Sequence, residues 1–123
     1  HLTDGERILQ SYPFQLSGGM QQRLAIALSL ILKPSIVFAD EPTSALDMLV
    51  QASVLDLMKE VTQALGATVI IVTHNIKSAA RIANSIGVMN KGQLVEVGST
   101  EEVMACPKDE YTRVLLDSVT KVV

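Results

Sequence analysis

Two short, almost wholly apolar segments, each followed by polar residues, constrain the fold most strongly. Residues 36–39 read Ile-Val-Phe-Ala and run into Asp40-Glu41-Pro42, and residues 68–72 read Thr-Val-Ile-Ile-Val and run into Thr73-His74. Continuous apolar runs of this length are typical of strands buried on both faces of a parallel sheet. We therefore expect two such strands, with polar side chains at their carboxyl ends, where α/β sheets bind ligands.

Helical patterns lie between and around these strands. A segment from Ser17 to Lys33 is apolar nearly all round, which predicts a helix capped by Ser17, stopped by Pro34 and buried on most sides. Apolar residues at three- and four-residue steps predict a helix over 48–65, with Asp47 as its cap and Gly66 at its end. Further predicted elements are helices over 75–84, 99–105 and 108–120 and a hairpin of strands 86–89 and 94–97. This alternation predicts an α/β fold with a mainly parallel sheet flanked by helices.

Length, charge and cysteine content exclude several classes of protein. The 123 residues fit a single domain, and a net charge of −3 without a basic run argues against nucleic-acid binding. One cysteine excludes an internal disulfide and a cysteine-built metal site. The longest nearly apolar run, Leu24 to Leu32, is about half of the ~20 residues that a membrane-spanning helix needs. The first residues show no signal-peptide pattern.

A diglycine at a helix start is the first candidate for chemistry. In Ser17-Gly18-Gly19, glycines let backbone N–H groups approach a ligand, and the helix dipole and the serine hydroxyl favour an anion there. The alternative is a flexible turn with a serine cap.

The polar ends of the two strands are the second candidate. Asp40 after a buried strand can hold Mg²⁺, and Glu41 can polarise an attacking water, whereas an acidic turn is the alternative. His74 is either a phosphate-contacting residue or a satisfied hydrogen-bonding side chain. Gly87 and Gly92 have the spacing of a phosphate-binding loop, but the lysine is missing, so we expect a hairpin turn there.

Together, and in this order, these segments resemble the nucleotide-binding subunits of ATP-binding-cassette (ABC) transporters. The matching segments are Leu16-Ser17-Gly18-Gly19 (signature), Ile36 to Glu41 (Walker B), Ser44-Ala45-Leu46-Asp47 (D-loop) and Thr73-His74 (switch histidine). Finer features resemble the dipeptide, oligopeptide and nickel importer branch: Tyr12-Pro13-Phe14-Gln15, Val50-Gln51-Ala52, Pro107 and Tyr111-Thr112. The resemblance implies a P-loop NTPase (RecA-like) fold, of which this chain is the C-terminal half.

The resemblance also implies a role for each matching residue. Asp40 would bind Mg²⁺, Glu41 would be the catalytic carboxylate, and His74 would contact the γ-phosphate of ATP. Ser17, Gly18, Gly19 and Gln21 would contact the γ-phosphate of ATP held by the opposite subunit, and Asp47 would communicate across that dimer. Asn75 departs from the family's usual aspartate.

The resemblance divides the chain into three segments and implies partners. Residues 1–33 would end a helical subdomain, 34–98 would hold core strands and helices, and 99–123 would form C-terminal helices. The parent would couple ATP hydrolysis to uptake of peptides or nickel at the cytoplasmic face of the membrane. It would work with a second ATP-binding subunit and with transmembrane permease subunits.

The family's Walker-A loop does not occur in these 123 residues. We therefore expect the chain alone to be inactive and to self-associate through unpaired strand edges. Alternatives are an ABC ATPase of another branch, such as an exporter or a chromosome-maintenance protein, and a non-catalytic piece that only pairs with a partner chain.

Overall fold

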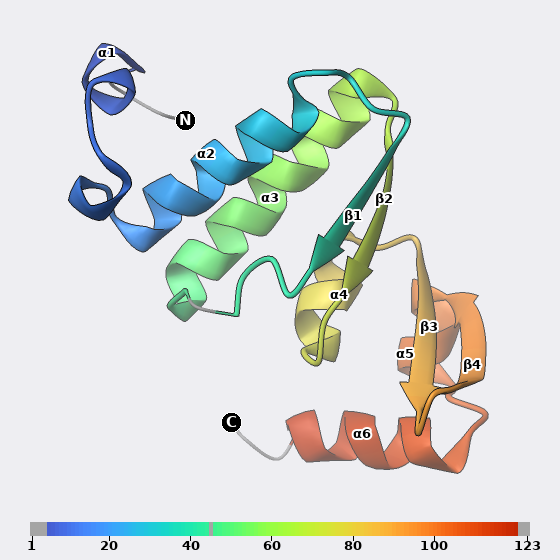
Figure 1. Ribbon diagram of the computed structural model, residues 1–123. Coiled ribbons are helices and arrows are strands. Elements are labelled where there is room, and N and C mark those ends of the chain that lie inside the picture. The colour runs from blue at the N-terminus through green and yellow to red at the C-terminus, as the bar shows by residue number, and fades with distance from the viewer. Residues whose placement is uncertain (1–4, 45, 121–123) are drawn as a thin grey trace. The chain divides into compact units, whose positions relative to one another are not determined.

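The computed structural model describes residues 5–44 and 46–120 and confirms the α/β fold class (Figure 1). Its elements are α1 (Gly5–Leu9), the 3-10 helix η1 (Pro13–Gln15), α2 (Gly18–Leu30), β1 (Ile36–Asp40), α3 (Met48–Leu65), β2 (Thr68–Val72), α4 (Ile76–Ile82), β3 (Ser85–Asn90), β4 (Gln93–Ser99), α5 (Thr100–Ala105) and α6 (Glu110–Thr120). The chain forms two compact units, of which the first ends at Thr73 and the second begins at His74. The division into segments 1–33, 34–98 and 99–123 stays a prediction, and residues 1–4, 45 and 121–123 lie outside the described part.

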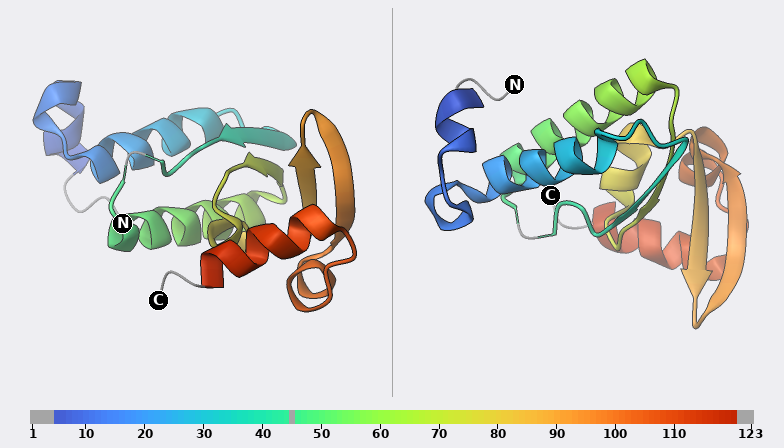
Figure 2. Two further views of the ribbon diagram at one scale, coloured as in Figure 1. Left: turned by 90° about the horizontal axis from the view of Figure 1, so that it is seen from below. Right: turned by 45° about the horizontal axis from the view of Figure 1, so that its top comes forward.

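In the first unit, two parallel strands lie against two helices. β1 and β2 pair in parallel from Ile36↔Thr68 to Asp40↔Val72. The helices α2 and α3 run alongside each other in the same direction (Figures 1 and 2). Their buried residues are Ile26, Leu30, Val54 and Met58, and the strand residues Val37, Ala39, Val69 and Ile71 pack against this cluster. This core joins both helices and one face of the strand pair, so it fixes where the carboxyl end of β1 lies relative to α3.

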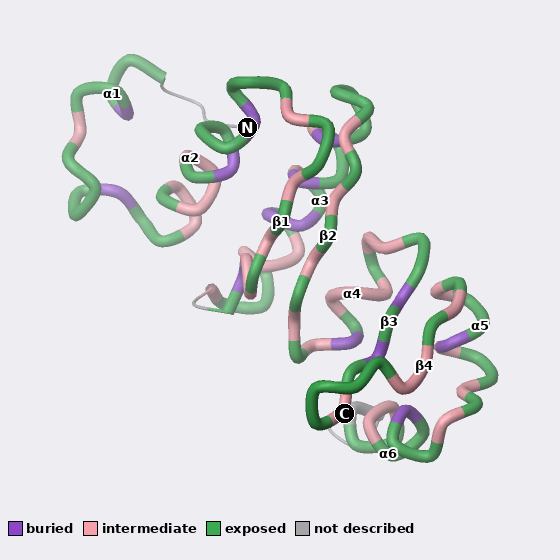
Figure 3. Tube along the Cα trace, turned by 45° about the vertical axis from the view of Figure 1, so that its right-hand side comes forward, coloured by how far each residue is buried: buried purple, intermediate pink, exposed green. Residues whose placement is uncertain are grey.

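The expectation that both strands are buried on two faces is wrong for the described residues. Burial alternates along β1 and β2 (Figure 3), and the face opposite the helices carries exposed apolar side chains: Ile36, Phe38, Ile70 and Val72. Phe38 is 75% exposed. The physical reason is that α2 and α3 cover a single face of the pair. A strand pair covered on one side buries every second residue.

Helix α2 also differs from its prediction. Only Ile26 and Leu30 are buried along it, while Leu28 is 62% exposed. Its buried stripe is the one that meets α3 and the strands, and the all-round apolar pattern therefore overstated its burial. The helix ends at Leu30 rather than at Lys33, whose φ of 49° lies outside the right-handed helical region. Proline at position 34 disfavours the helical conformation of the residue before it.

The predicted ends of α3 are confirmed. The Asp47 side chain accepts hydrogen bonds from the backbone N–H groups of Leu49 (3.1 Å) and Val50 (3.0 Å). At the other end Gly66 adopts a left-handed conformation with φ of 66°. Such a C-terminal glycine lets the chain turn back without a Cβ clash, so β2 starts two residues later.

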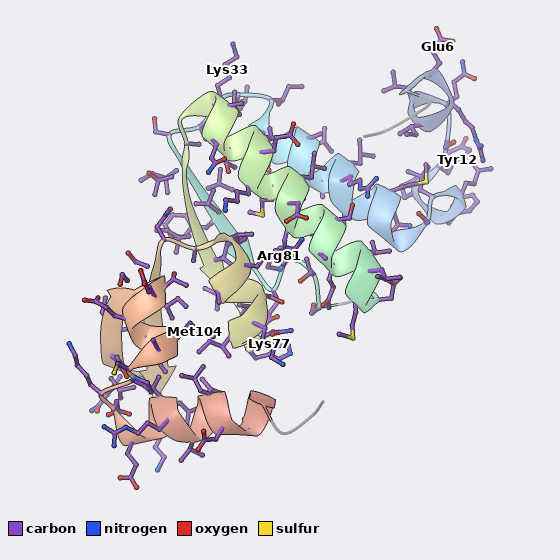
Figure 4. All side chains as sticks on the ribbon, turned by 180° about the vertical axis from the view of Figure 1, so that it is seen from behind. Glu6, Tyr12, Lys33, Lys77, Arg81 and Met104 are labelled. Atoms are coloured by element: carbon purple, nitrogen blue, oxygen red, sulfur yellow. The ribbon has the colours of Figure 1, made fainter. Side chains whose placement is uncertain are left out.

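The second unit is built on the predicted hairpin. β3 and β4 pair antiparallel, and Lys91 and Gly92 make the tight turn with φ values of 48° and 80°. Ile86 and Val88 of β3 pack with Val103 of α5, and residues of α4 and α6 join them, together with Met104, which Figure 4 labels. Ser99 and Glu102 form the predicted capping box at the start of α5. Gly87 therefore lies in β3 and Gly92 in the turn of the hairpin, as expected, although the two glycines have the spacing of a phosphate-binding loop.

A single carboxylate of β4 organises the loop before α6. Glu96 accepts hydrogen bonds from the backbone N–H groups of Lys108 (2.9 Å) and Asp109 (3.1 Å). The bond from Lys108 is the main reason why the pKa of Glu96 lies below its ordinary value of 4.5. The buried Thr112 hydroxyl and the Asp109 N–H lower the pKa further, although the hydroxyl does not reach hydrogen-bond geometry. Ionised Glu96 thus holds the start of α6 onto the hairpin.

Among the described residues, no helix is both long enough and apolar enough to cross a membrane.

We predict that Glu96 makes the stability of the chain depend on pH. A carboxyl group whose pKa is lowered by folding stabilises the folded state above its ordinary pKa of 4.5. That contribution is lost as the pH falls through the lowered value. Replacing Glu96 with Gln should therefore lower the urea midpoint at pH 7, and the difference from the wild type should shrink below pH 4.5.

Glu101→Gln removes a negative charge from an exposed side chain of the same unit and is the matched control. Urea denaturation followed by circular dichroism at pH 7 and at pH 3 measures the effect. Equal pH dependence of the wild type and Glu96→Gln would contradict this role of Glu96.

Candidate functional site

The diglycine segment forms a capped helix start, as predicted. The Ser17 side chain accepts a hydrogen bond from the backbone N–H of Met20 at 3.4 Å, and Gly18 and Gly19 are the first two residues of α2. Ser17 and Gly18 are exposed. The serine cap and an anion site are compatible here, because the cap leaves other N–H groups of the first turn pointing out of the helix end.

Gly19 also has a packing role. A Cβ at this position would lie 2.7 Å from the Cγ1 atom of Val50, whereas a Cβ at Gly18 would lie 3.4 Å from the Cδ2 atom of Leu46. The first distance is shorter than real Cβ contacts, and the second is an ordinary contact. Only Gly19 is therefore required for the close approach of the starts of α2 and α3.

This close approach brings two predicted motifs together. A hollow of about 310 Å³ at the paired helix starts is lined by Ser17, Gly18, Gly19, Met20, Arg23, Leu46, Asp47 and Val50. The signature residues and Asp47 of the D-loop thus border one open cavity, although they come from different helices. Asp47 is exposed and already caps α3, so its position is fixed by the helix that it starts.

Arg23 is a site residue that sequence reasoning missed. Its guanidinium donates a hydrogen bond to the hydroxyl of Ser53 at 2.7 Å, which links α2 to α3 beside the hollow. It also gives the hollow a permanent positive charge, which favours binding of an anion. The signal was available in the sequence: Arg23 lies four residues after Gly19, on the same face of a helix.

The carboxylates of Asp40 and Glu41 lie at the carboxyl end of β1, as predicted. Asp40 is the last residue of β1 and is exposed, and the backbone N–H of Glu41 continues the ladder by donating to the carbonyl oxygen of Val72 at 2.8 Å. Glu41 then adopts a left-handed conformation with φ of 45°. A non-glycine residue in this conformation is uncommon and strained, and such strain clusters at functional sites.

The turn after Glu41 is held from both sides. The backbone N–H and the hydroxyl of Ser44 donate to the Glu41 carbonyl oxygen at 3.3 and 3.2 Å. The Gln51 side chain of α3 donates to the carbonyl oxygen of buried Thr43 at 2.8 Å. The turn that carries the acidic pair is therefore tied to the same helix that Asp47 caps.

The donor chemistry at Asp40 suits Mg²⁺. Magnesium is bound in proteins by one or two carboxylates, with water and substrate phosphates as the other ligands. Asp40 and Glu41 supply carboxylates at the open end of a strand, although the described residues hold no group of three or more metal-ligating side chains.

His74 is exposed and belongs to the second unit. It follows Val72, the pairing partner of Asp40, by two residues in the sequence. The next residue, Asn75, caps α4 by accepting from the N–H groups of Lys77 (3.1 Å) and Ser78 (3.2 Å). Asparagine caps helices as well as aspartate does, so this departure from the family pattern preserves the local structure. Proximity of His74 to the acidic pair stays a prediction, as do the catalytic roles of the named residues.

Comparisons with known proteins agree with these motifs. A family model described as "AAA domain, putative AbiEii toxin, Type IV TA system" matches residues 5–78. The chain is 49% identical over 117 residues to the dipeptide transport ATP-binding protein DppD of Caldanaerobacter subterraneus. The matched region covers 95% of this chain and 36% of that protein. It is 44% identical over 121 residues to the metal-staphylopine import system ATP-binding protein CntD of Staphylococcus aureus, covering 98% and 45%. The chain thus spans less than half the length of these relatives.

Among solved structures, the chain is similar to the ATP-binding cassette MJ0796 in a dimeric post-hydrolysis state bound to ADP and Pi. The TM-score is 0.64 at 38% identity, over 77% of this chain and 40% of that chain. Similarity at this level confirms the expected ATP-binding-cassette fold.

We predict that Gly19→Ala destabilises the first unit. The new methyl group would push the starts of α2 and α3 apart, and such overpacking costs about 1–3 kcal/mol. The better helix propensity of alanine offsets at most about 1 kcal/mol of that cost. The urea midpoint measured by circular dichroism should therefore fall.

Gly18→Ala is the matched control, because its methyl group meets Leu46 at an ordinary contact distance. It should leave the midpoint unchanged or raise it slightly. If both variants behave alike, the contact between Gly19 and Val50 does not control the packing of the two helices.

Proposed function

Because the chain belongs to the AAA-domain family and forms part of an ABC-type ATP-binding domain, we propose that the intact subunit hydrolyses ATP to drive uptake of a solute. The observation that carries this proposal is the hollow shared by the signature residues Ser17, Gly18 and Gly19 and by Asp47. A helix start with exposed N–H groups and a nearby guanidinium suits a phosphate group.

The residues at the strand ends would serve the chemistry. Mg²⁺ bound with ATP neutralises charge on the phosphates, and Asp40 would hold it. Glu41 would orient the attacking water or accept its proton, and its fixed turn supports this role because general-base catalysis depends on position. His74 would donate a hydrogen bond to the γ-phosphate.

The hollow would complete a site in a second subunit. In this proposal Ser17, Gly18 and Gly19 face the γ-phosphate of ATP held by a partner ATP-binding subunit, Gln21 supports this helix start, and Asp47 lies at the same interface. The dimeric state named for the similar ATP-binding cassette supports such pairing. The dimer would dock on transmembrane permease subunits at the cytoplasmic face of the membrane.

Peptides and metal complexes are the proposed solutes. The similar proteins are named for dipeptide transport and for metal-staphylopine import, which supports the peptide or nickel importer branch over an exporter or a chromosome-maintenance protein. The choice between peptide and metal rests with the permease and its solute receptor in this proposal.

We also propose that this chain alone does not hydrolyse ATP. Its 123 residues contain no Gly-x-x-x-x-Gly-Lys-Ser/Thr loop, and phosphoryl transfer in P-loop enzymes depends on the lysine and backbone of that loop. A piece that only pairs with a complementary chain remains the alternative. Restored activity on mixing with a chain that carries the loop would favour a split enzyme.

We predict that Glu41→Gln in the intact subunit abolishes ATP hydrolysis while ATP binding survives. The amide keeps the size of the side chain but cannot accept a proton. Phosphate release and equilibrium binding of labelled ATP measure the two effects. Equal loss of hydrolysis and of ATP binding would contradict the catalytic role of Glu41. If the 123-residue chain alone hydrolyses ATP and its Glu41→Gln variant does not, the proposed inactivity of the chain is wrong.

We further predict that the 123-residue chain self-associates through the exposed face of β1 and β2. Contiguous exposed apolar side chains on a strand pair favour association. Phe38→Ser should shift the mass measured by light scattering toward the monomer. Leu32→Ser, which removes an exposed leucine outside the strands, is the control. A monomeric wild-type chain would contradict the prediction.

A further inference from the structure

The side chain of Gln21 spans the turn that leads into the signature motif. Its amide nitrogen donates to the carbonyl oxygen of Pro13 at 2.6 Å and to that of Leu16 at 3.2 Å. Both acceptors are backbone carbonyl groups, so only the amide nitrogen can make these bonds. The two hydrogens of the amide are therefore committed to the segment before Ser17.

A second glutamine, Gln15, makes hydrogen bonds within the same turn. The Gln15 side chain accepts a hydrogen bond from the backbone N–H of Tyr12 at 2.8 Å, and the backbone N–H groups of Gln15 and Leu16 donate to the carbonyl oxygens of Tyr12 and Pro13. The rings of Tyr12 (labelled in Figure 4) and Phe14 stack with 5.5 Å between centroids, and both are exposed. Hydrogen bonds, rather than burial, thus shape most of this turn.

Only Leu16 of this segment is buried. An exposed turn that lacks apolar burial would fluctuate unless polar contacts restrain it. The bonds from Gln21 are such a restraint, and they run from the first turns of α2 back to the residue directly before its cap. They fix the direction in which the chain enters Ser17, whose hydroxyl caps α2.

We propose that Gln21 is a positioning residue that holds the 12–16 turn and, through it, the Ser17-Gly18-Gly19 tip in the geometry that a phosphate group meets. Gln21 acts through backbone carbonyl groups and does not contact the ligand through its amide nitrogen. The catalytic consequence of this role rests on the proposed function, whereas the structural role does not.

Amide hydrogen exchange in the absence of nucleotide tests the structural role. Gln21→Ala should speed exchange of the Gln15 and Leu16 amides by about tenfold, because the loss of both side-chain bonds lets the turn open more often. The near-isosteric Gln21→Glu lacks the donors and should do the same, which covers the case that Gln21→Ala fails to fold. Gln21→Lys keeps a donor and should retain protection. Gln63→Ala, at an exposed glutamine of α3, is the control and should change nothing.

ATPase assays of the same variants in the intact subunit test the catalytic consequence. The rate should follow the protection of the turn, falling by about tenfold in Gln21→Ala and Gln21→Glu and recovering in Gln21→Lys. Unchanged exchange at Gln15 and Leu16 in Gln21→Ala overturns the proposal. A rate that falls without any change in exchange also overturns it, in favour of direct phosphate contact. If the wild-type subunit shows no turnover but exchange changes as expected, the proposed function fails and the structural role of Gln21 stands.

Discussion

The close contact between the starts of α2 and α3 is the constraint on which the candidate site depends. Gly19 permits the approach to Val50, and the hydrogen bond from Arg23 to Ser53 ties the helices together one turn further on. The buried cluster of Ile26, Leu30, Val54 and Met58 continues the same contact along both helices. Because α2 begins with the diglycine and Asp47 caps the start of α3, packing the two helices in parallel places both motifs at one end of the unit.

The acidic pair is positioned by the same helix. The core packs one face of β1 against α3, and Gln51 of α3 binds the turn that follows Glu41. The strained backbone of Glu41 is stabilised by this turn, since hydrogen bonds to its carbonyl oxygen and from its N–H fix it on both sides. One helix therefore sets the positions of the D-loop aspartate and of the two carboxylates at the carboxyl end of β1.

The exposed apolar face of β1 and β2 shows how far pattern alone reaches. Continuous apolar runs are typical of strands that are covered on both faces. In the part of the chain that the structure describes, α2 and α3 cover only one face of β1 and β2. The pattern in α2 overstated burial for the same reason. Burial of an apolar side chain is favourable, but the neighbouring elements decide whether that side chain is buried.

The sequence by itself determined the local structure and the identity of the motifs. The caps Ser17, Asp47 and Ser99, the left-handed Gly66 and the hairpin at Lys91-Gly92 were all readable, because each depends on hydrogen bonds or backbone freedom within a few residues. The tertiary structure decided which residues meet from different elements. It formed the hollow shared by Gly19 and Asp47 and the hydrogen bond from Arg23 to Ser53. It also set the hydrogen bonds from Gln21 to the carbonyl oxygens of Pro13 and Leu16. These contacts depend on the packing of one helix against another or on the path of a turn, and no local periodicity specifies either.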